Sequence, residues 1–396
     1  MLDFDAARRT ILESVVRLES ERIPLSLARN RVLAEDIVAQ SPLPAFDYSA
    51  MDGYAVRAAD VPDTLPCELP VAGECRAGGA PSRLPPGAAL RIFTGAVLPD
   101  GADSIVLQEN TERVEQGVRL LERPLASEHI RRRGDDLAMG ALALAQGTRL
   151  GAFQLGLAAA LDQADVCVVR RPRLCVVASG DELRAPGSPG GEGTIPESNA
   201  LVVAALAEYA GAEARIGPRI PDELGTATRL LSELIGQSDV LVTIGGVSVG
   251  DHDVMRHALR DAGARIDFWK VAIKPGKPFV FGRAGSGYLL GLPGNPVSAQ
   301  ITFALFGLPL LRALAGELRP VRSTTRVALA HAFQQKPGRL GVYRGRLDGT
   351  RVHLDGNQAS GATTSLARAD CLVFVPKETS ECAPGTELEA LRLSEL

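Results

Sequence analysis

Two apolar runs in the second half of the chain end abruptly in turns suited to binding an anion. Residues 240–244 stop at Gly245 and Gly246, and residues 288–292 stop at the turn PGNP. Glycines in such turns let backbone N–H groups approach an anion closely. Short apolar runs of this kind are typical of strands buried on both faces, and parallel sheets bind ligands just outside the carboxyl ends of such strands. We therefore expect both turns to lie at a ligand site.

The same two turns carry further groups for an anion. Asn295 is suited to an N-cap and Pro296 to the first helical position, so a helix is expected to begin there. The N–H donors and partial positive charge of a helix N-terminus favour phosphate or an oxyanion. Ser248 adds a hydroxyl group to the glycine-rich turn.

Three lysines lie between the two turns. They are Lys270, Lys274 and Lys277, and the last two belong to the segment KPGKP, which ends at Pro278. Its prolines fix φ and restrict the residue before each of them, so the lysines are held in a pre-set geometry. Each turn by itself is equally compatible with an ordinary βα connection, but the turns and lysines together predict a site for a highly anionic ligand.

Acidic side chains in turns form a second group of candidates: Asp52, Asp136, Glu182 and Asp253. Carboxylates repel a nearby phosphate unless a cation lies between them, and Mg²⁺ takes one or two carboxylates plus phosphate oxygens. We therefore expect Mg²⁺ with these residues. The structural alternatives are an N-cap for Asp253, Asx-turns for Asp52 and Asp136, and pairing of Asp136 with the arginines at 131–133.

A third group consists of Arg344, Ser360 and Thr94. Arginine presents a planar fork that suits a tetrahedral oxyanion. From composition alone, however, an exposed arginine at a β edge is the favoured interpretation of Arg344, and a turn hydroxyl that of Thr94.

The composition is that of a soluble globular protein with two to four domains in 396 residues. The net charge of −4 provides no global basic field for nucleic acid.

The N-terminus lacks a signal-peptide core, and no run approaches the ~20 apolar residues of a membrane span. The six cysteines show no CxxC spacing and the five histidines no HxxxH pair. These patterns predict free thiols in a reducing cytoplasm and argue against a disulfide framework, a zinc site or a His-based metal site.

The elements that must position these residues fall into blocks. A helix capped by Asp5 is expected over residues 5–18. Residues 43–137 alternate short apolar runs with Gly, Pro and Asp, which is typical of a small antiparallel β domain. Residues 150–161 are expected to form a helix that leads into a strand at 166–169.

The later part of the chain has two further blocks. From Arg173 strand and helix patterns alternate, which predicts βαβ units and an α/β domain with a doubly wound parallel sheet. Ser198, Asp222 and Asp253 are the expected caps of its helices. From Arg319 the alternating runs indicate a C-terminal β domain.

Several motifs occur together along nearly the whole chain. They are AFDYSAMDGYAVR (45–57), RIFTGAVLPDGAD (91–103), RRRGDDLAMG (131–140), SGDEL (179–183), GGVSVGDHD (245–253), KPGKP (274–278), GLPGNPVS (291–298) and GNQASG (356–361). In this order they resemble the MoeA-type molybdopterin molybdotransferases, which include the E domain of gephyrin. Two stretches depart from the family pattern: Tyr48 stands where Asn is common, and IPESN (195–199) differs from the common acidic-Thr-Asn pattern. Because of these two departures, the resemblance does not define the edge of the substrate pocket.

The resemblance implies a plan of four parts. An elongated N-terminal domain is formed by residues 1–42 and a return segment, 138–170, with a β-barrel-like domain, 43–137, inserted into it. A doubly wound molybdopterin-binding domain, 171–318, and a C-terminal β-barrel-like domain, 319–396, follow. The discontinuity of the first domain is implied by the resemblance alone.

The resemblance also implies a function: insertion of molybdenum from molybdate into adenylylated molybdopterin, with release of AMP and dependence on Mg²⁺. Catalytic roles carry over to Asp52, Thr94, Asp136, Glu182, Asp222 and Asp253, and metal ligation to Asp52, Asp136, Glu182 and Asp253. Binding roles carry over to Gly245, Gly246, Ser248, Lys270, Lys274, Lys277, Pro278, Asn295, Pro296, Arg344 and Ser360. Preference for molybdate over tungstate does not follow from the sequence.

A homodimer with a composite site is expected, because Asp52 and Arg344 belong to peripheral β-rich regions while the anion-binding turns belong to the doubly wound domain. Other proteins of molybdenum cofactor biosynthesis are expected partners. The rival interpretation is a non-catalytic module that binds a pterin while its β domains contact another protein. Several carboxylates favour the enzyme, since simple anion binding would avoid them.

Overall fold

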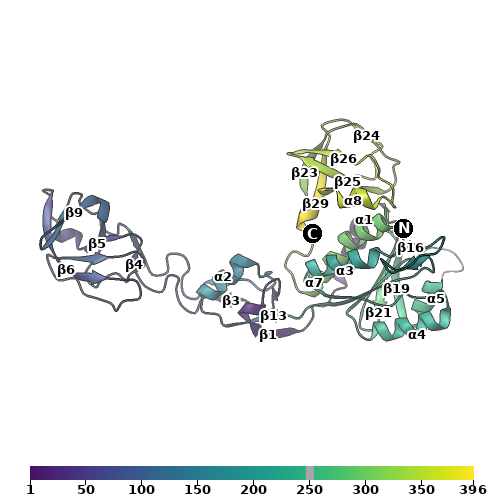
Figure 1. Ribbon diagram of the computed structural model, residues 1–396, viewed down its shortest axis with the longest axis horizontal. Coiled ribbons are helices and arrows are strands. Elements are labelled where there is room, and N and C mark those ends of the chain that lie inside the picture. The colour runs from purple at the N-terminus through teal and green to yellow at the C-terminus, as the bar shows by residue number, and fades with distance from the viewer. Residues whose placement is uncertain (247–253) are drawn as a thin grey trace. The chain divides into compact units, whose positions relative to one another are not determined.

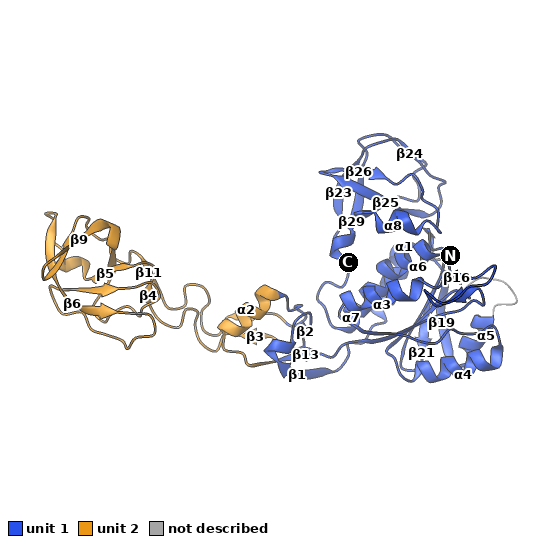
Figure 2. Cartoon of the chain, in the orientation of Figure 1, with its two compact units in different colours: residues 1–35, 146–151, 166–396 blue, residues 36–145, 152–165 orange. Residues whose placement is uncertain are grey.

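The computed structural model describes residues 1–246 and 254–396. The chain forms two compact units, shown in Figure 2. Unit 1 contains residues 1–35, 146–151 and 166–396, and unit 2 contains residues 36–145 and 152–165. Unit 1 is built from segments that are distant in the sequence, whereas the two segments of unit 2 are separated only by residues 146–151.

Unit 2 is built around a curled six-stranded sheet of order β8-β5-β7-β6-β10-β9. Strand β5 is buried along its whole length because each face of the sheet has its own core: Tyr54 and Val56 face one cluster, and Ala55 faces the other. The strands are β5 (Gly53–Val56), β6 (Cys67–Cys75), β7 (Ala89–Ile92), β8 (Ser104–Leu107), β9 (Thr111–Val114) and β10 (Gly117–Leu120).

Smaller elements complete unit 2. Two short antiparallel pairs join segments that precede the curled sheet in the sequence to segments that follow it: β4 pairs with β11, and β3 pairs with β12. Their bounds, with that of the helix, are β3 (Ile37–Val38), β4 (Tyr48–Ser49), β11 (Ile130–Arg131), β12 (Leu142–Leu144) and α2 (Ala152–Ala160).

The first helix of unit 1, α1 (Phe4–Glu13), is shorter than expected and is capped by Asp3, not Asp5. The Asp3 carboxylate accepts from the N–H of Asp5. At the other end, the Tyr288 hydroxyl donates to the Ser14 carbonyl and accepts from the Val16 N–H. A side chain distant in the sequence therefore takes over the backbone groups that would have continued the helix. Strands β1 (Ser20–Pro24), β13 (Asp165–Val169) and β2 (Val32–Leu33) form a separate sheet in that order.

The doubly wound domain holds a six-stranded sheet of order β17-β14-β18-β22-β21-β19. Its strands β19 and β21 are labelled in Figure 1. The strands are β14 (Arg173–Ala178), β17 (Glu213–Ile216), β18 (Val240–Ile244), β19 (Ala264–Lys270), β21 (Pro278–Ala284) and β22 (Gly287–Leu292). The first four in the order are parallel, as expected, and β18 is buried along its whole length. Strand β21 is antiparallel to both of its neighbours, β22 and β19, because the connections 271–277 and 285–286 are too short for a crossover.

Helices cover both faces of this sheet. One hydrophobic cluster packs α3, α6, α7 and α1 against it, and another packs α4 and α5. The bounds are α3 (Asn199–Tyr209), α4 (Leu224–Ile235), α5 (Val254–Asp261), α6 (Pro296–Thr302), a π-helical segment (Phe303–Gly307) and α7 (Leu308–Leu314). Helix α4 is capped by the Glu223 carboxylate, which accepts from the Gly225 and Thr226 N–H groups, so the expected cap Asp222 is wrong.

The predicted helix start at Pro296 opens one continuous helix, Pro296–Leu314. By length and composition it is long and apolar enough to cross a membrane, contrary to the expectation that no such run exists. Its apolar window is 94% buried inside the protein, which is typical of the core helix of a globular domain.

The C-terminal β domain is a closed barrel. Its strands run in the order β25-β26-β23-β29-β27, and an additional β25–β27 pairing closes the ring. Strand β20 (Ile273–Lys274), from the KPGKP segment, pairs with β25 outside the ring. The bounds are β23 (Thr325–Leu329), β25 (Leu340–Asp348), β26 (Arg351–Leu354), β27 (Cys371–Val375) and β29 (Glu387–Arg392), with helix α8 (Thr363–Ala367) and a side pair of β24 (Phe333–Gln334) and β28 (Glu381–Cys382). All six cysteines are free thiols, as predicted.

Candidate active site

The carboxyl ends of three parallel strands meet in the doubly wound domain. Ser179 follows β14, Gly245 follows β18 and Gly294 lies two residues beyond β22. The N–H of Gly245 donates to the Leu292 carbonyl at 3.1 Å. Gly245 has φ +83, and a Cβ there would lie 2.8 Å from the Ser179 carbonyl oxygen, so a side chain at this position would block the turn. A Cβ on Gly294 would lie 3.7 Å from the Gly245 Cα, so the two predicted turns are neighbours.

Two polar residues reach these strand ends. The Ser179 hydroxyl donates to Oδ1 of Asp222 at 3.3 Å, which brings this predicted carboxylate to the end of β14. Asn199, the first residue of α3, donates from Nδ2 to the Gly294 carbonyl at 2.9 Å. Asn199 was not among the predicted site residues, because an Asn at a helix start is indistinguishable from an ordinary helix-terminal residue. Its Oδ1 is buried and has no hydrogen-bond partner among the described residues.

The start of helix α6 is already engaged by the C-terminal domain. Pro296 has no N–H to offer, and the N–H of Val297 donates to the Ser360 carbonyl at 3.0 Å. Asn295 occupies the N-cap position, as predicted, without a side-chain cap bond. The contact brings Ser360 to the PGNP turn, but it uses one of the N–H donors that we expected to be free for phosphate.

Arg344 lies inside the barrel domain with its side chain fully buried. Its guanidinium donates to the Ser365 hydroxyl and to the carbonyls of residues 357, 358 and 359, at distances of 3.0–3.2 Å. Four of its five N–H donors are thus used within the domain. Burial lowers the pKa of Arg344, and the nearby Asp355 opposes that shift. This corrects both interpretations of Arg344: it is neither exposed at a β edge nor a fork open to an oxyanion, but it holds the loop that carries Ser360.

The KPGKP turn packs tightly on helix α6. Gly276 has φ +105, and a Cβ there would lie 2.3 Å from the Thr302 methyl group. Lys274 and Lys277, on either side of this glycine, are exposed. Lys270 ends β19 and is paired in register with Pro278. The turn that carries Lys274 and Lys277 is therefore fixed against Thr302, the last residue of α6.

Unit 2 brings together Asp52 and Thr94. Oδ1 of Asp52 accepts from the Thr94 N–H at 2.8 Å and from its hydroxyl at 2.7 Å. These bonds, with a smaller contribution from the charge of Arg91, hold the pKa of Asp52 below its ordinary value. Thr94 thereby fixes the position of a carboxylate that is ionised at neutral pH even at its ordinary pKa.

Arg91, which was not among the predicted site residues, supports this pair. It donates to the Gly53 carbonyl at 2.8 Å and to Gln108 at 2.7 Å, and its guanidinium lies over the rings of Tyr54 and Phe93. Gln108 in turn donates its N–H to the Asp52 carbonyl. The signal in the sequence was an arginine inside an otherwise apolar strand, ALRI.

Asp136 and Glu182 are exposed carboxylates. Asp136 lies in a turn of unit 2 whose backbone N–H donates to the Leu43 carbonyl. Asp47, not Asp136, accepts from Arg132, at 2.7 Å, so the suggested pairing is found at another acidic residue. Glu182, in unit 1, lies against Gly180, where a Cβ would come within 2.6 Å of its carboxylate.

Among residues 1–246 and 254–396, no three His, Cys, Asp or Glu side chains gather where they would hold a metal ion. The predicted ligands Asp52 and Asp136 belong to unit 2 and Glu182 to unit 1. Asp253 and Ser248 lie outside the described residues. Mg²⁺ needs only one or two carboxylates when phosphate and water supply the rest, and in unit 1 the exposed Glu182 offers one.

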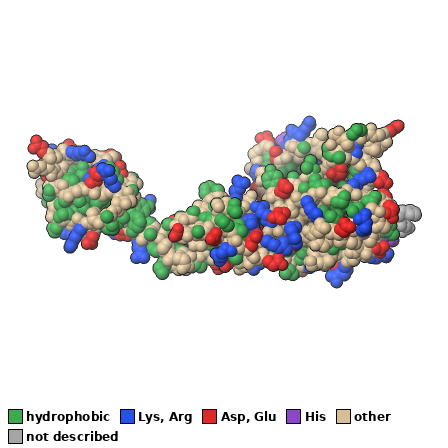
Figure 3. Space-filling model, turned by 60° about the horizontal axis from the view of Figure 1, so that its bottom comes forward, with side chains coloured by type: hydrophobic (Ala, Val, Ile, Leu, Met, Phe, Trp, Pro, Cys, Tyr) green, Lys and Arg blue, Asp and Glu red, His purple; other side chains and the backbone are tan. Residues whose placement is uncertain are grey.

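The charge of the protein surface is mixed. On the face shown in Figure 3, Lys and Arg side chains are interspersed with Asp and Glu. An anion would therefore be recognised by the local arrangement of lysines and turn N–H groups and not by a broad field. Chemically, this arrangement can bind a phosphorylated ligand and stabilise charge on its oxygens.

Three family profiles match consecutive parts of the chain. Residues 2–161 match the MoeA N-terminal region (domain I and II), and residues 175–313 match a probable molybdopterin binding domain. Residues 326–393 match the MoeA C-terminal region (domain IV).

Similar proteins match over nearly their full length. The molybdopterin molybdenumtransferase of Haemophilus influenzae is 36% identical, with 97% of each chain covered. Molybdopterin molybdenumtransferase 2 of Mycobacterium tuberculosis is 37% identical, with 98% of each covered. The crystal structure of the molybdopterin biosynthesis MoeA protein from Pyrococcus horikoshii OT3 is 25% identical, has a TM-score of 0.87, and covers 98% of this chain and 99% of that one.

Proposed function

The chain belongs to the MoeA family of molybdopterin molybdenumtransferases, and we propose that it inserts molybdenum from molybdate into adenylylated molybdopterin with release of AMP. In this reaction a water molecule cleaves the phosphoanhydride bond, so that AMP leaves and the other phosphate stays on molybdopterin. The two dithiolene thiols bind molybdenum in place of one oxo ligand of molybdate, which leaves as water with the two thiol protons. A role as a transferase in molybdenum cofactor biosynthesis follows from the family.

One observation supports the substrate class most strongly: the turns at Gly245 and Gly294 are neighbours, beside the helix that begins at Pro296. Backbone N–H groups, a helix N-terminus and nearby lysines are the usual partners of phosphate groups. Asn199 supports this arrangement because its amide fixes the Gly294 carbonyl. In the proposed reaction, Gly245, Gly246, Ser248, Asn295 and Pro296 hold phosphate.

The lysines neutralise charge on the oxyanions. Lys274 and Lys277 lie on a turn fixed by the packing of Gly276 on Thr302, and Lys270, at the end of β19, is paired with Pro278 of the same segment. Because the turn is held before the ligand binds, little reorganisation is needed when charge develops, which is electrostatic preorganisation. Ser360 contributes from the loop that Arg344 stabilises.

Carboxylates place the metal and orient the anhydride. Asp52, Asp136, Glu182 and Asp253 are the proposed Mg²⁺ ligands, with Asp222 beside Ser179 as a further catalytic carboxylate. When bound, Mg²⁺ would neutralise the pyrophosphate and act as a Lewis acid on it. Asp52 suits this role because two hydrogen bonds from Thr94 fix the position of its carboxylate.

A homodimer in the cytoplasm is the proposed working form, with other proteins of molybdenum cofactor biosynthesis as partners. The six free thiols are typical of a reducing compartment. The alternative is a non-catalytic pterin-binding module. The ionised Asp52 favours the enzyme, because a site that only bound an anion would gain nothing from a carboxylate.

Single-turnover release of AMP from adenylylated molybdopterin by the purified protein, with molybdate and Mg²⁺, tests the proposal. The enzyme releases AMP in a molybdate-dependent step, whereas a binding module retains the substrate intact. Binding of the substrate without any AMP release would refute the enzymatic assignment.

A further inference from the structure

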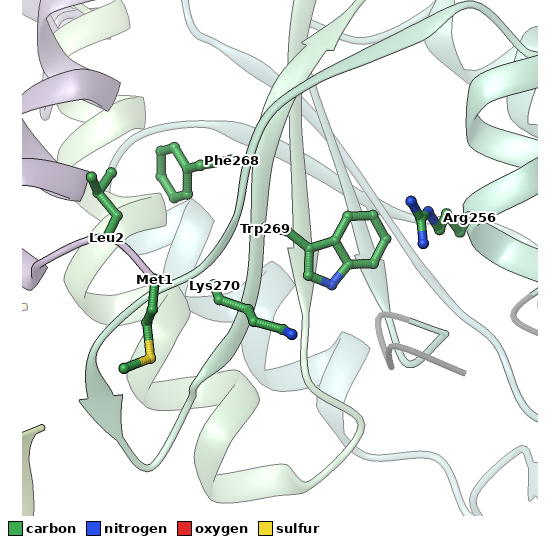
Figure 4. Close-up of a pocket in the computed structure, with 6 residues that line it drawn as sticks. All are labelled: Met1, Leu2, Arg256, Phe268, Trp269 and Lys270. Carbon is green, nitrogen blue, oxygen red and sulfur yellow. The ribbon is translucent and has the colours of Figure 1, made fainter. Parts of the chain in front are cut away.

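A pocket opens next to Lys270, at the end of strand β19 (Figure 4). Its volume is about 480 Å³, within the range of pockets that hold small molecules. It is lined by Met1, Leu2, Arg256, Phe268, Trp269 and Lys270. The wall is thus mostly aromatic and aliphatic, and two cationic side chains complete it.

The walls of the pocket are held by contacts on both sides of β19. Phe268 packs against Phe279 and Phe281, with ring centroids 6.0 and 5.5 Å apart. The Leu2 N–H donates to the Lys270 carbonyl at 2.9 Å, and the Leu2 carbonyl accepts from Ala272 at 2.8 Å. The strand that carries Trp269 therefore has little freedom to move.

Trp269 is partly exposed in the pocket and does not belong to the buried core. The Arg256 guanidinium lies 4.9 Å from the centroid of its ring, a cation–π contact. In Figure 4 Arg256 lies on one side of the indole, and Lys270 and Met1 lie on the other. A large flat side chain is thus presented between two cations.

We propose that this pocket binds the flat heteroaromatic ring of the substrate, stacked on Trp269; this inference rests on the proposed function. An aromatic side chain can stack on any flat heteroaromatic ring, because every nucleobase or pterin has a π-face. Lys270, which the proposed function assigns to oxyanion charge, lines the same pocket as Trp269. A ring in the pocket therefore has its attached phosphate within the reach of that lysine.

Adenine and pterin share this chemistry, and the single tryptophan distinguishes them. Trp269 is the only tryptophan in the chain, so selectively excited tryptophan fluorescence reports on this pocket alone. The wild-type protein is titrated with AMP, with 6-hydroxymethylpterin, and with ribose 5-phosphate as a phosphate without a ring, each corrected for absorption by the ligand. We expect AMP or the pterin to change the emission, which identifies the ring, and ribose 5-phosphate to leave it unchanged.

Calorimetry on variants separates stacking from folding. Trp269→Leu should weaken binding of the ring ligand roughly 10-fold or more, while Trp269→Phe should retain most of it. Wild-type affinity in Trp269→Leu, or no ring-dependent change in fluorescence, would overturn the proposal. Molybdate-dependent AMP release without a ring-dependent change in fluorescence would refute ring binding in this pocket but not the enzymatic function. A ring-dependent change in fluorescence without AMP release would refute the enzymatic function but not ring binding in this pocket.

Discussion

The backbone N–H of Val297 donates to the carbonyl oxygen of Ser360 at 3.0 Å. This bond joins the first turn of helix α6, which follows the PGNP turn, to a loop of the C-terminal barrel. The loop is held in turn by Arg344, which donates to the carbonyls of residues 357, 358 and 359. Contacts within the barrel are therefore expected to control a helix start in the doubly wound domain.

Replacing Arg344 with lysine tests this relationship. A lysine has three donors on a flexible stem and cannot reproduce the planar fork, so Arg344→Lys should cost about 3 kcal/mol of unfolding free energy and free the loop. Hydrogen exchange at the Val297 amide should become faster. Arg346→Lys, an exposed position on the same strand, is the control. Unchanged exchange at Val297 in Arg344→Lys would show that the loop does not depend on this arginine.

The pKa of Asp52 should depend on the Thr94 hydroxyl. Thr94→Val removes one of two hydrogen bonds to Oδ1 and should raise that pKa toward its ordinary value, whereas Thr94→Ser should not. Carboxyl NMR titration measures the shift, and the acid limb of AMP release should move to higher pH with it. Asp52→Asn should keep the fold and abolish turnover; full AMP release by that variant at saturating Mg²⁺ would exclude a catalytic role.

Gly276 should be irreplaceable for two separable reasons, its positive φ and its contact with Thr302. Gly276→Ala is expected to lose about 3 kcal/mol of unfolding free energy and to weaken molybdate binding, because the lysine turn must move. Gly338→Ala is a matched control, since Gly338 has φ +104 but a Cβ added there would meet nothing within 4 Å. Equal losses of unfolding free energy in urea for the two variants would show that the Thr302 contact contributes nothing.

Glu317 should stabilise the end of helix α7 in a pH-dependent way. Its side chain is 8% exposed and accepts from Arg149 at 2.8 Å and Arg322 at 2.6 Å. Burial alone would raise its pKa, but the two arginines outweigh burial and lower it. Burial lowers the pKa of the neighbouring Arg312 to about 10. Glu317→Gln leaves Arg149 and Arg322 without this counter-charge and should lower the free energy of unfolding by about 3 kcal/mol at neutral pH.

The sign of the pH dependence follows from the lowered pKa. A carboxylate of this kind stabilises the fold above its unfolded-state pKa, and the stabilisation is lost as the pH falls through the folded-state pKa. The difference in unfolding free energy between wild type and Glu317→Gln should therefore be constant above about pH 4.5 and shrink below it. Glu233→Gln, which affects an exposed pair with Arg229, should show almost no difference. A difference that does not change with pH would exclude the charge as its cause.

The composite-site proposal predicts complementation between inactive chains. Mixing Asp52→Asn with Lys277→Ala should restore about one intact site per mixed dimer, because two-fold symmetry pairs each site with residues of both chains. AMP release is measured after mass spectrometry shows that subunit exchange is complete. Mixed dimers that remain inactive would count against a shared site.

The sequence by itself determined the features that depend on local patterns. The apolar run at 240–244 predicted a buried parallel strand, and Asn295-Pro296 predicted the helix start, because periodicity, glycine and proline act on their own neighbourhood. The short runs within 43–137 likewise predicted antiparallel β structure, which the curled sheet confirms except at the pair β6–β7, whose strands are parallel. The motifs were sufficient to identify the family, since together and in this order they are specific to it.

Only the tertiary structure decided which distant groups meet. Asn199 binds the Gly294 carbonyl and Tyr288 ends helix α1, although 95 and 274 residues, respectively, separate the partners. The same holds for Arg344, which composition placed at an exposed edge and which folding buries among loop carbonyls. A local pattern gives the hydrogen-bonding capacity of a side chain, but its partner is set by the packing of elements that are remote in the sequence.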